Sequence, residues 1–117
     1  RVCTSNSPWL LETKVGEIYS VPISHGEGRF IAPETLLDQL AESGQVATQY
    51  VDLSGQPSLD TAFNPNGSLR AIEGILSPDG RVLGKMGHSE RVGKELYRNV
   101  PGSYDMGLFR SAVRYFK

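Results

Sequence analysis

The chain is organised around one stretch, Gly84-Lys85-Met86-Gly87-His88-Ser89-Glu90-Arg91. An extended, apolar-flanked segment leads into a histidine, and a carboxylate follows two residues later. Residues i and i+2 of an extended backbone leave on the same side, so His88 and Glu90 can face one cleft if the next helix begins after Glu90. The carboxylate would then fix the imidazole tautomer and leave its other nitrogen as a general base. The pair predicts two members of a nucleophile–base–orienter triad. The alternative is a strand-end histidine beside an exposed, salt-bridged Glu90–Arg91 pair.

The same stretch closes the second arm of a predicted β-hairpin. Residues 71–76 and 81–86 are rich in apolar residues, and Ser77-Pro78-Asp79-Gly80 between them is a turn signature. The second arm would deliver His88 and Glu90 at its end. Residues 91–97 then predict a short helix.

A second His-x-Glu motif, His25-Gly26-Glu27-Gly28, follows a predicted strand over residues 16–24. Pro22 removes one ladder donor and suggests an edge position or the strand's end. The flanking glycines would let the backbone approach a ligand closely. Two such pairs in a chain with two histidines argue against an accident of composition. The alternative is a glycine-rich turn with a solvated glutamate.

The remaining elements follow from local signals. Residues 32–43 predict a core helix without chemistry, and residues 45–53 predict a strand. Turn-forming residues gather at Asn64-Pro65-Asn66-Gly67-Ser68. Apolar residues recur at helical spacing over residues 108–116 and predict an amphipathic C-terminal helix whose aromatic stripe belongs to the core.

The bulk composition narrows the class of protein. The 117 residues suffice for one domain, and a content of 38% hydrophobic and 21% charged residues predicts a globular chain. A net charge of −1 argues against a nucleic-acid partner, and no apolar run is long enough for a membrane span. The single cysteine, Cys3, fits a reducing, cytoplasmic location. No glycine flanks it, so it does not fit a nucleophile elbow and is interpreted as a structural or incidental thiol.

Three segments taken in order resemble a known family. They are the His25-to-Gly28 motif after Val-Pro-Ile-Ser, the Asn64-to-Ser68 turn leading into Ile-Glu-Gly-Ile, and the hairpin that ends in His88 and Glu90. Their order and spacing resemble the glutaminase domain of phosphoribosylformylglycinamidine synthase, a class I glutamine amidotransferase. The resemblance covers nearly the whole chain. The C-terminal residues resemble the long, fused synthase more than the separate glutaminase subunit, which is the alternative.

The resemblance implies an α/β fold: part of a three-layer, flavodoxin-like domain with a mixed sheet, a C-terminal β-hairpin and helices. Residues 1–117 would be the C-terminal portion of that domain, without the first strands and the elbow cysteine. His88 and Glu90 match the family's catalytic base and orienter. Many members have proline where this chain has Ser89. The loop residues implied near the substrate or active site, without a catalytic role, are His25, Gly26, Glu27, Gly28, Asn64 and Asn66.

The resemblance also implies the reaction. A thiolate attacks the carboxamide of glutamine, and ammonia passes to an ATP-dependent synthetase domain that converts formylglycinamide ribonucleotide to its amidine. ATP and magnesium would act in that domain, and no cofactor is expected in this segment. The partners implied are glutamine, the missing amidotransferase segment and the synthetase domain. Without the elbow cysteine the segment is expected to be inactive alone, and surface left open by the missing strands is expected to favour self-association.

Two other interpretations stay open. His25, Glu27, His88 and Glu90 could supply four metal ligands if the two strand ends are adjacent, although no close His/Cys spacing supports this. Alternatively, both His-x-Glu pairs are surface polar groups of a non-catalytic interaction module.

Overall fold

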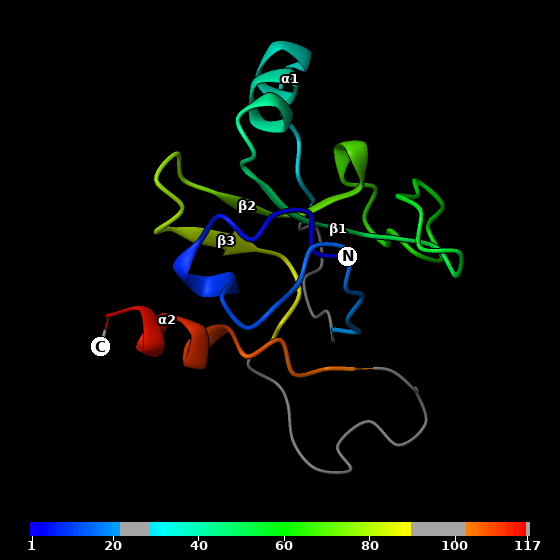
Figure 1. The fold of residues 1–117 in the computed structure, drawn as a ribbon. Coiled ribbons are helices and arrows are strands. Elements are labelled where there is room, and N and C mark those ends of the chain that lie inside the picture. The colour runs from blue at the N-terminus through cyan, green and yellow to red at the C-terminus, as the bar shows by residue number, and fades with distance from the viewer. Residues whose placement is uncertain (22–28, 90–102, 117) are drawn as a thin grey trace.

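A small antiparallel sheet forms the centre of the structure, a computed structural model that describes residues 1–21, 29–89 and 103–116. Within these residues the sheet has three strands in the order β1-β2-β3 (Figure 1). The strands are β1 (Val46–Gln49), β2 (Ile72–Leu76) and β3 (Leu83–Lys85). Every pairing in this described part is antiparallel, including an isolated bridge between Val2 and Thr48. The parallel pairing that a mixed sheet requires is not seen here.

The predicted β-hairpin is confirmed, with β2 and β3 as its arms. The turn places Gly80 at φ +74°, a conformation that favours glycine. Asp79 accepts a hydrogen bond from the Arg81 amide at 3.0 Å, and the Ser7 hydroxyl donates to the Gly80 carbonyl at 2.6 Å. The turn is therefore held both by its own side chains and by the N-terminal segment.

The predicted strand over residues 16–24 is wrong for residues 16–21, which belong to no strand. Their backbone groups bond to two different segments instead of one neighbouring strand. The Val2 amide donates to Glu17 O at 2.9 Å, and the Ser20 amide donates to Ser103 O at 2.7 Å. Apolar and β-branched composition indicated an extended chain here, but a strand also needs a partner running alongside it.

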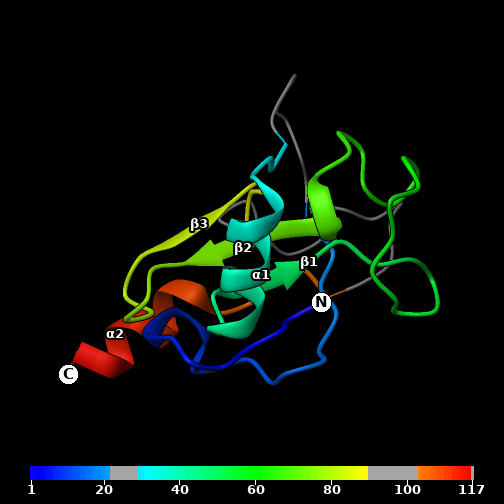
Figure 2. The ribbon, with the colours of Figure 1, turned by 90° about the horizontal axis from the view of Figure 1, so that it is seen from above.

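Helices cover both faces of the sheet. Helix α1 (Glu34–Glu42) lies on one side, and the 3₁₀ helix η1 (Pro8–Leu10) lies with α2 (Leu108–Phe116) on the other (Figures 1 and 2). Helix α1 confirms the helix predicted over residues 32–43 and buries Leu37 and Leu40. A second 3₁₀ turn, η2 (Leu69–Ala71), leads into β2.

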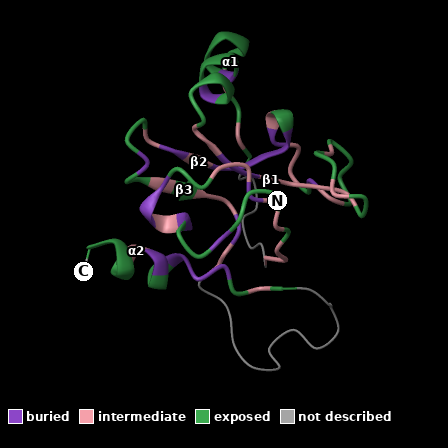
Figure 3. Ribbon diagram, viewed as in Figure 1, coloured by how far each residue is buried: buried purple, intermediate pink, exposed green. Residues whose placement is uncertain are grey.

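Helix α2 is confirmed, but its aromatic stripe does not lie in a core formed by the described residues. The helix buries Leu108 and Ser111, whereas Phe109 and Phe116 are 61% and 68% exposed (Figure 3). Helical spacing indicates an apolar face but does not say what covers it. The buried core lies between α2, η1 and the sheet and consists of Val2, Leu10, Ala47, Leu76, Met106 and Leu108.

Candidate functional site

The predicted site residues fall partly outside the described chain. His25, Gly26, Glu27, Gly28 and Glu90 lie outside the described residues, as does the helix predicted over residues 91–97. His88, Asn64 and Asn66 are described. Residues on both sides of the His25-to-Gly28 motif are also described, and they locate the ends of that segment.

The first flank of the His25 motif lies against the end of the hairpin. A Cβ atom built on Gly87 would stand 2.4 Å from Cγ2 of Val21 and 2.8 Å from Oε1 of Glu73. Both distances are far shorter than van der Waals contact, so Val21 packs directly on the bare backbone of Gly87. The residue before His88 therefore touches the chain that leads into the first motif.

The second flank lies against the Asn64-to-Ser68 turn. The Phe30 amide donates to the Ser68 hydroxyl at 2.9 Å, and the Leu69 amide donates to Phe30 O at 2.9 Å. Ser68 is fully buried. Val21 and Phe30, which flank the His25 motif in the sequence, thus contact the hairpin end and the Asn64-to-Ser68 turn respectively.

A pocket of about 450 Å³ occupies this region. Its lining includes Val21 from the first motif's flank, Pro65 from the turn, and Glu73 and Lys85 from the hairpin. A volume of this size is in the range of small-molecule sites. His88 is half-buried next to this hairpin end and is not part of the pocket lining.

Two tyrosines on the pocket wall keep their protons at neutral pH. Burial raises the pKa of Tyr50 to about 12, with the Glu73 carboxylate as a second cause. Burial, the hydrogen bond to Glu17 and the charge of Glu17 raise the pKa of Tyr19 to about 12. Both phenols are therefore neutral, and that of Tyr19 donates to Oε2 of Glu17 at 2.9 Å.

Glu73 forms the buried polar centre of the hairpin. No sequence motif predicts a role for this residue. It is 6% exposed, and its Oε2 accepts from the Thr48 hydroxyl at 2.5 Å. Its Oε1 accepts from Lys85 Nζ at 2.6 Å and from the Gly87 amide at 2.9 Å. A single Glu in one apolar hairpin arm and a single Lys in the other is the signal that could have revealed the pair.

Asn64 uses its side chain to hold its own loop. The carboxamide is fully buried, donates to the carbonyls of Ser58 and Ser68 at 3.1 and 3.0 Å, and accepts from the Ser68 amide at 3.0 Å. These bonds indicate that Asn64 shapes the turn. A role for Asn64 and Asn66 in an active-site loop stays a prediction.

Comparison with known proteins identifies the family. The model of the CobB/CobQ-like glutamine amidotransferase domain matches residues 1–116. The chain belongs to this family. Membership of this family agrees with the observed α/β arrangement of a sheet between helices, as expected for part of a flavodoxin-like amidotransferase domain.

Individual relatives of this amidotransferase chain carry a more specific name. The chain is similar to "phosphoribosylformylglycinamidine synthase subunit PurQ" of Methanosarcina mazei, with 43% identity over 87% of this chain and 43% of the relative. Identity to the proteins of the same name from Gloeobacter violaceus and Chlorobium luteolum is 38% and 40%, over 97% of this chain and 47% of each relative. The chain spans about half the length of these relatives. Because they are separate subunits, they support that alternative over the fused synthase.

The one cysteine of the amidotransferase chain, Cys3, is half-buried. Burial raises the pKa of the Cys3 thiol, and its Sγ lies 3.4 Å from Oε1 of Gln49. A raised pKa disfavours the thiolate that a nucleophile needs, which agrees with the interpretation of Cys3 as a structural thiol.

The described residues contain neither a metal-binding cluster nor a membrane-spanning helix. In residues 1–21, 29–89 and 103–116, no three His, Cys, Asp or Glu side chains group so that they could hold a metal ion. Three of the four predicted metal ligands lie outside those residues, so that hypothesis stays a prediction. In the same part of the chain, no helix combines the length and apolar character needed to cross a membrane.

Proposed function

We propose that this chain is the C-terminal portion of a glutaminase that supplies ammonia to phosphoribosylformylglycinamidine synthase, a glutamine-dependent carbon–nitrogen ligase of purine biosynthesis. The observation that carries the proposal is the family match over residues 1–116, joined with relatives that all bear the same subunit name. The contacts of Val21 with Gly87 and of Phe30 with Ser68 support it, because a glutaminase must hold its base and its substrate loops together.

In this proposal His88 is the general base and Glu90 is the carboxylate that orients it. The nucleophile is an elbow cysteine in the part of the domain that this segment does not contain. His88 takes the thiol proton as sulfur attacks the amide carbon of glutamine, and returns it to the departing nitrogen so that ammonia leaves. His88 then deprotonates a water molecule, which hydrolyses the thioester to glutamate and restores the thiol.

The loops around the pocket are assigned to substrate binding. His25 and Glu27 would present polar groups to glutamine or to the neighbouring domain, while Gly26 and Gly28 allow a close backbone approach. Asn64 and Asn66 belong to the turn that Ser68 ties to Phe30, and Pro65 of this turn lines the pocket; the two asparagines would hold that loop beside the substrate. The support for this assignment is the contact of both flanks with the other two motifs.

The remaining partners of the parent enzyme follow from the same proposal. Ammonia is consumed by the ATP-dependent synthetase domain, where ATP and magnesium would activate formylglycinamide ribonucleotide. The chain's role is confined to releasing ammonia.

The proposal is tested by replacing His88 in the full-length protein, assayed with its synthetase. His88→Asn should lower glutamine-dependent synthesis at least about a thousandfold, as expected for loss of a triad member, and leave ammonia-dependent synthesis unchanged. Ser89→Ala, in the same loop, is the matched control and should retain both activities. If His88→Asn retains glutamine-dependent synthesis, the triad assignment is wrong and a non-catalytic interaction module is the better account.

A further inference from the structure

Two charged side chains hold the peptide groups of the residue that precedes His88. The amide of Gly87 donates to Oε1 of Glu73 at 2.9 Å, and the carbonyl of Gly87 accepts from Nζ of Lys85 at 3.2 Å. That carbonyl belongs to the peptide bond between Gly87 and His88. The backbone leading into His88 is therefore fixed on its donor side and its acceptor side by one ion pair.

The ion pair is itself fixed in position. Glu73 and Lys85 are 6% and 12% exposed and meet at 2.6 Å. The second carboxylate oxygen of Glu73 accepts from Thr48 on β1. The network thus links all strands of the described sheet to the His88 loop. With both carboxylate oxygens bonded to groups on fixed strands, the carboxylate has little freedom to rotate.

Stability alone does not explain such a pair. Replacing a buried ion pair by apolar side chains of similar volume is often neutral or stabilising, because both charges have lost their hydration. Apolar side chains cannot, however, bond to the amide and carbonyl of Gly87. The feature that the charges alone provide is the defined orientation of the peptide groups next to His88.

The glycine at this position fits the same arrangement. A Cβ on residue 87 would come within 2.4 Å of Val21 and 2.8 Å of Oε1 of Glu73. This added Cβ would push the Glu73 carboxylate away from the Gly87 amide, which donates a hydrogen bond to it. Gly87 therefore allows the backbone to lie directly between Val21 and Glu73.

We propose that Glu73 and Lys85 are positioning residues for the reaction, which hold the Gly87–His88 peptide so that the imidazole meets the nucleophile. This inference rests on the proposed function, since it assigns the pair a purpose through His88. Misplacing a catalytic group by about 1 Å can cost about a hundredfold in rate. Because His88 moves a proton and does not bind glutamine, loss of its position lowers kcat and leaves KM unchanged, whereas a rise in KM would mean that Glu73 and Lys85 contact glutamine at the pocket wall.

The test compares single and double variants of the full-length protein with its synthetase. Glu73→Met and Lys85→Met each leave a buried charge unpaired and should lower both Tm and glutamine-dependent kcat. The double variant removes both buried charges, so Tm should recover in part, although the Gly87 amide and carbonyl lose their partners. Its glutamine-dependent kcat should stay about ten- to a hundredfold low, with KM for glutamine within about twofold and ammonia-dependent activity unchanged. Recovery of kcat together with Tm would overturn the inference.

Controls separate this inference from the proposed function. The control ion pair is Arg70 with Glu34, an exposed pair at 2.7 Å between η2 and α1, and Glu34→Met with Arg70→Met should leave kcat unchanged. If the double Met variant does not fold, Thr48→Val decides: it removes one hydroxyl from the Glu73 carboxylate and keeps the ion pair, so kcat should fall several-fold while Tm falls less than in Glu73→Met. Full kcat in Thr48→Val would then contradict the inference. If His88→Asn loses glutamine-dependent activity while the Glu73, Lys85 and Thr48 variants keep it, the positioning role is wrong and the proposed function stands.

Discussion

Gly80 and Gly44 share a backbone conformation but differ in their surroundings. Their φ values are +74° and +71°. A Cβ on Gly80 would lie 2.4 Å from the backbone oxygen of Asn6, whereas nothing lies within 4 Å of a Cβ on Gly44. Gly80 is thus required both by the turn and by the N-terminal segment that packs on it.

We therefore expect Gly80→Ala to destabilise the full-length protein more than Gly44→Ala. Left-handed strain should cost each variant about 1 kcal/mol. Gly80→Ala should lose roughly 1–3 kcal/mol more, because Asn6 backbone must move. The difference is read from urea unfolding of both variants at one pH. Equal free energies of unfolding would show that the Gly80–Asn6 contact is not tight.

At the scale of elements, α2 is anchored at its start by one carboxylate. Asp105 accepts from Nη1 of Arg110 at 3.0 Å and from the Gly107 amide at 2.8 Å. The Arg110 hydrogen bond, followed by the Gly107 amide, lowers the pKa of Asp105 below its usual 3.8. Arg110 also lies 3.5 Å from Glu12, which follows η1, so this cluster joins α2 to η1.

The lowered pKa sets the sign of a pH effect. Asp105 is ionised more readily in the folded protein, so its contribution to stability is present above about pH 4 and is lost as pH falls through the folded pKa. Asp105→Asn should therefore reduce the acid-induced loss of stability between about pH 5 and 3. The effect should stay below about 1 kcal/mol because the carboxylate is half-exposed. Thermal unfolding against pH measures it, with exposed Glu42→Gln as control; an unchanged acid slope would contradict the assignment.

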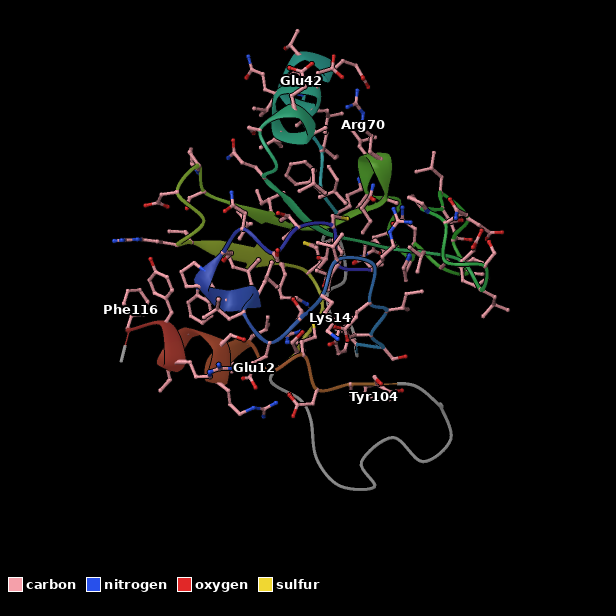
Figure 4. All side chains as sticks on the ribbon, viewed as in Figure 1. Glu12, Lys14, Glu42, Arg70, Tyr104 and Phe116 are labelled. Atoms are coloured by element: carbon pink, nitrogen blue, oxygen red, sulfur yellow. The ribbon has the colours of Figure 1, made fainter. Side chains whose placement is uncertain are left out.

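At the scale of the whole molecule, the described part carries an apolar surface on α2. Phe109, Val113 and Phe116 are all more than half exposed, and Phe116 lies at the outer end of the helix (Figure 4). Beside α1, in contrast, the exposed side chain of Arg70 is paired to Glu34 and Asp38. Exposed apolar stripes of this kind are typical of surfaces that another chain or segment covers.

The isolated chain of 117 residues should consequently self-associate. Its apparent mass in sedimentation should rise with concentration, and Val113→Ser with Phe116→Ser should reduce that rise by removing apolar area. Leu53→Ser, at a fully exposed loop position away from α2, is the control. A monomer at every concentration tested would contradict this expectation.

The isolated chain should also fail to hydrolyse glutamine. The base without its nucleophile leaves only a small residual catalysis, and Cys3 is a half-buried thiol whose raised pKa disfavours attack. Ammonia release from glutamine measures this directly. Turnover that disappears in Cys3→Ala would mean that the nucleophile lies within the segment.

The sequence predicted those features that local chemistry controls. The hairpin follows from its turn residues, and α1 and α2 follow from helical spacing. The prediction of a strand at residues 16–24 is wrong for its described part, because strand pairing depends on distant segments. The prediction that Phe109 is buried in the core is wrong for the same reason. The Glu73–Lys85 pair was missed because burial of a charge shows only when three strands are assembled. The role of His88 is predicted from its spacing to Glu90 and stays a prediction, whereas the contact of Val21 with Gly87 could be seen only in the fold.

The central claim is that the end of this hairpin presents His88 to a cysteine supplied by the rest of the glutaminase domain. The most direct measurement is the distance between the His88 imidazole and the sulfur of that cysteine in a crystal structure of the full-length protein. We predict a separation of about 3 Å, or slightly more without substrate. An imidazole pointing away from the sulfur, with Gly87 no longer held by Glu73 and Lys85, would contradict the account.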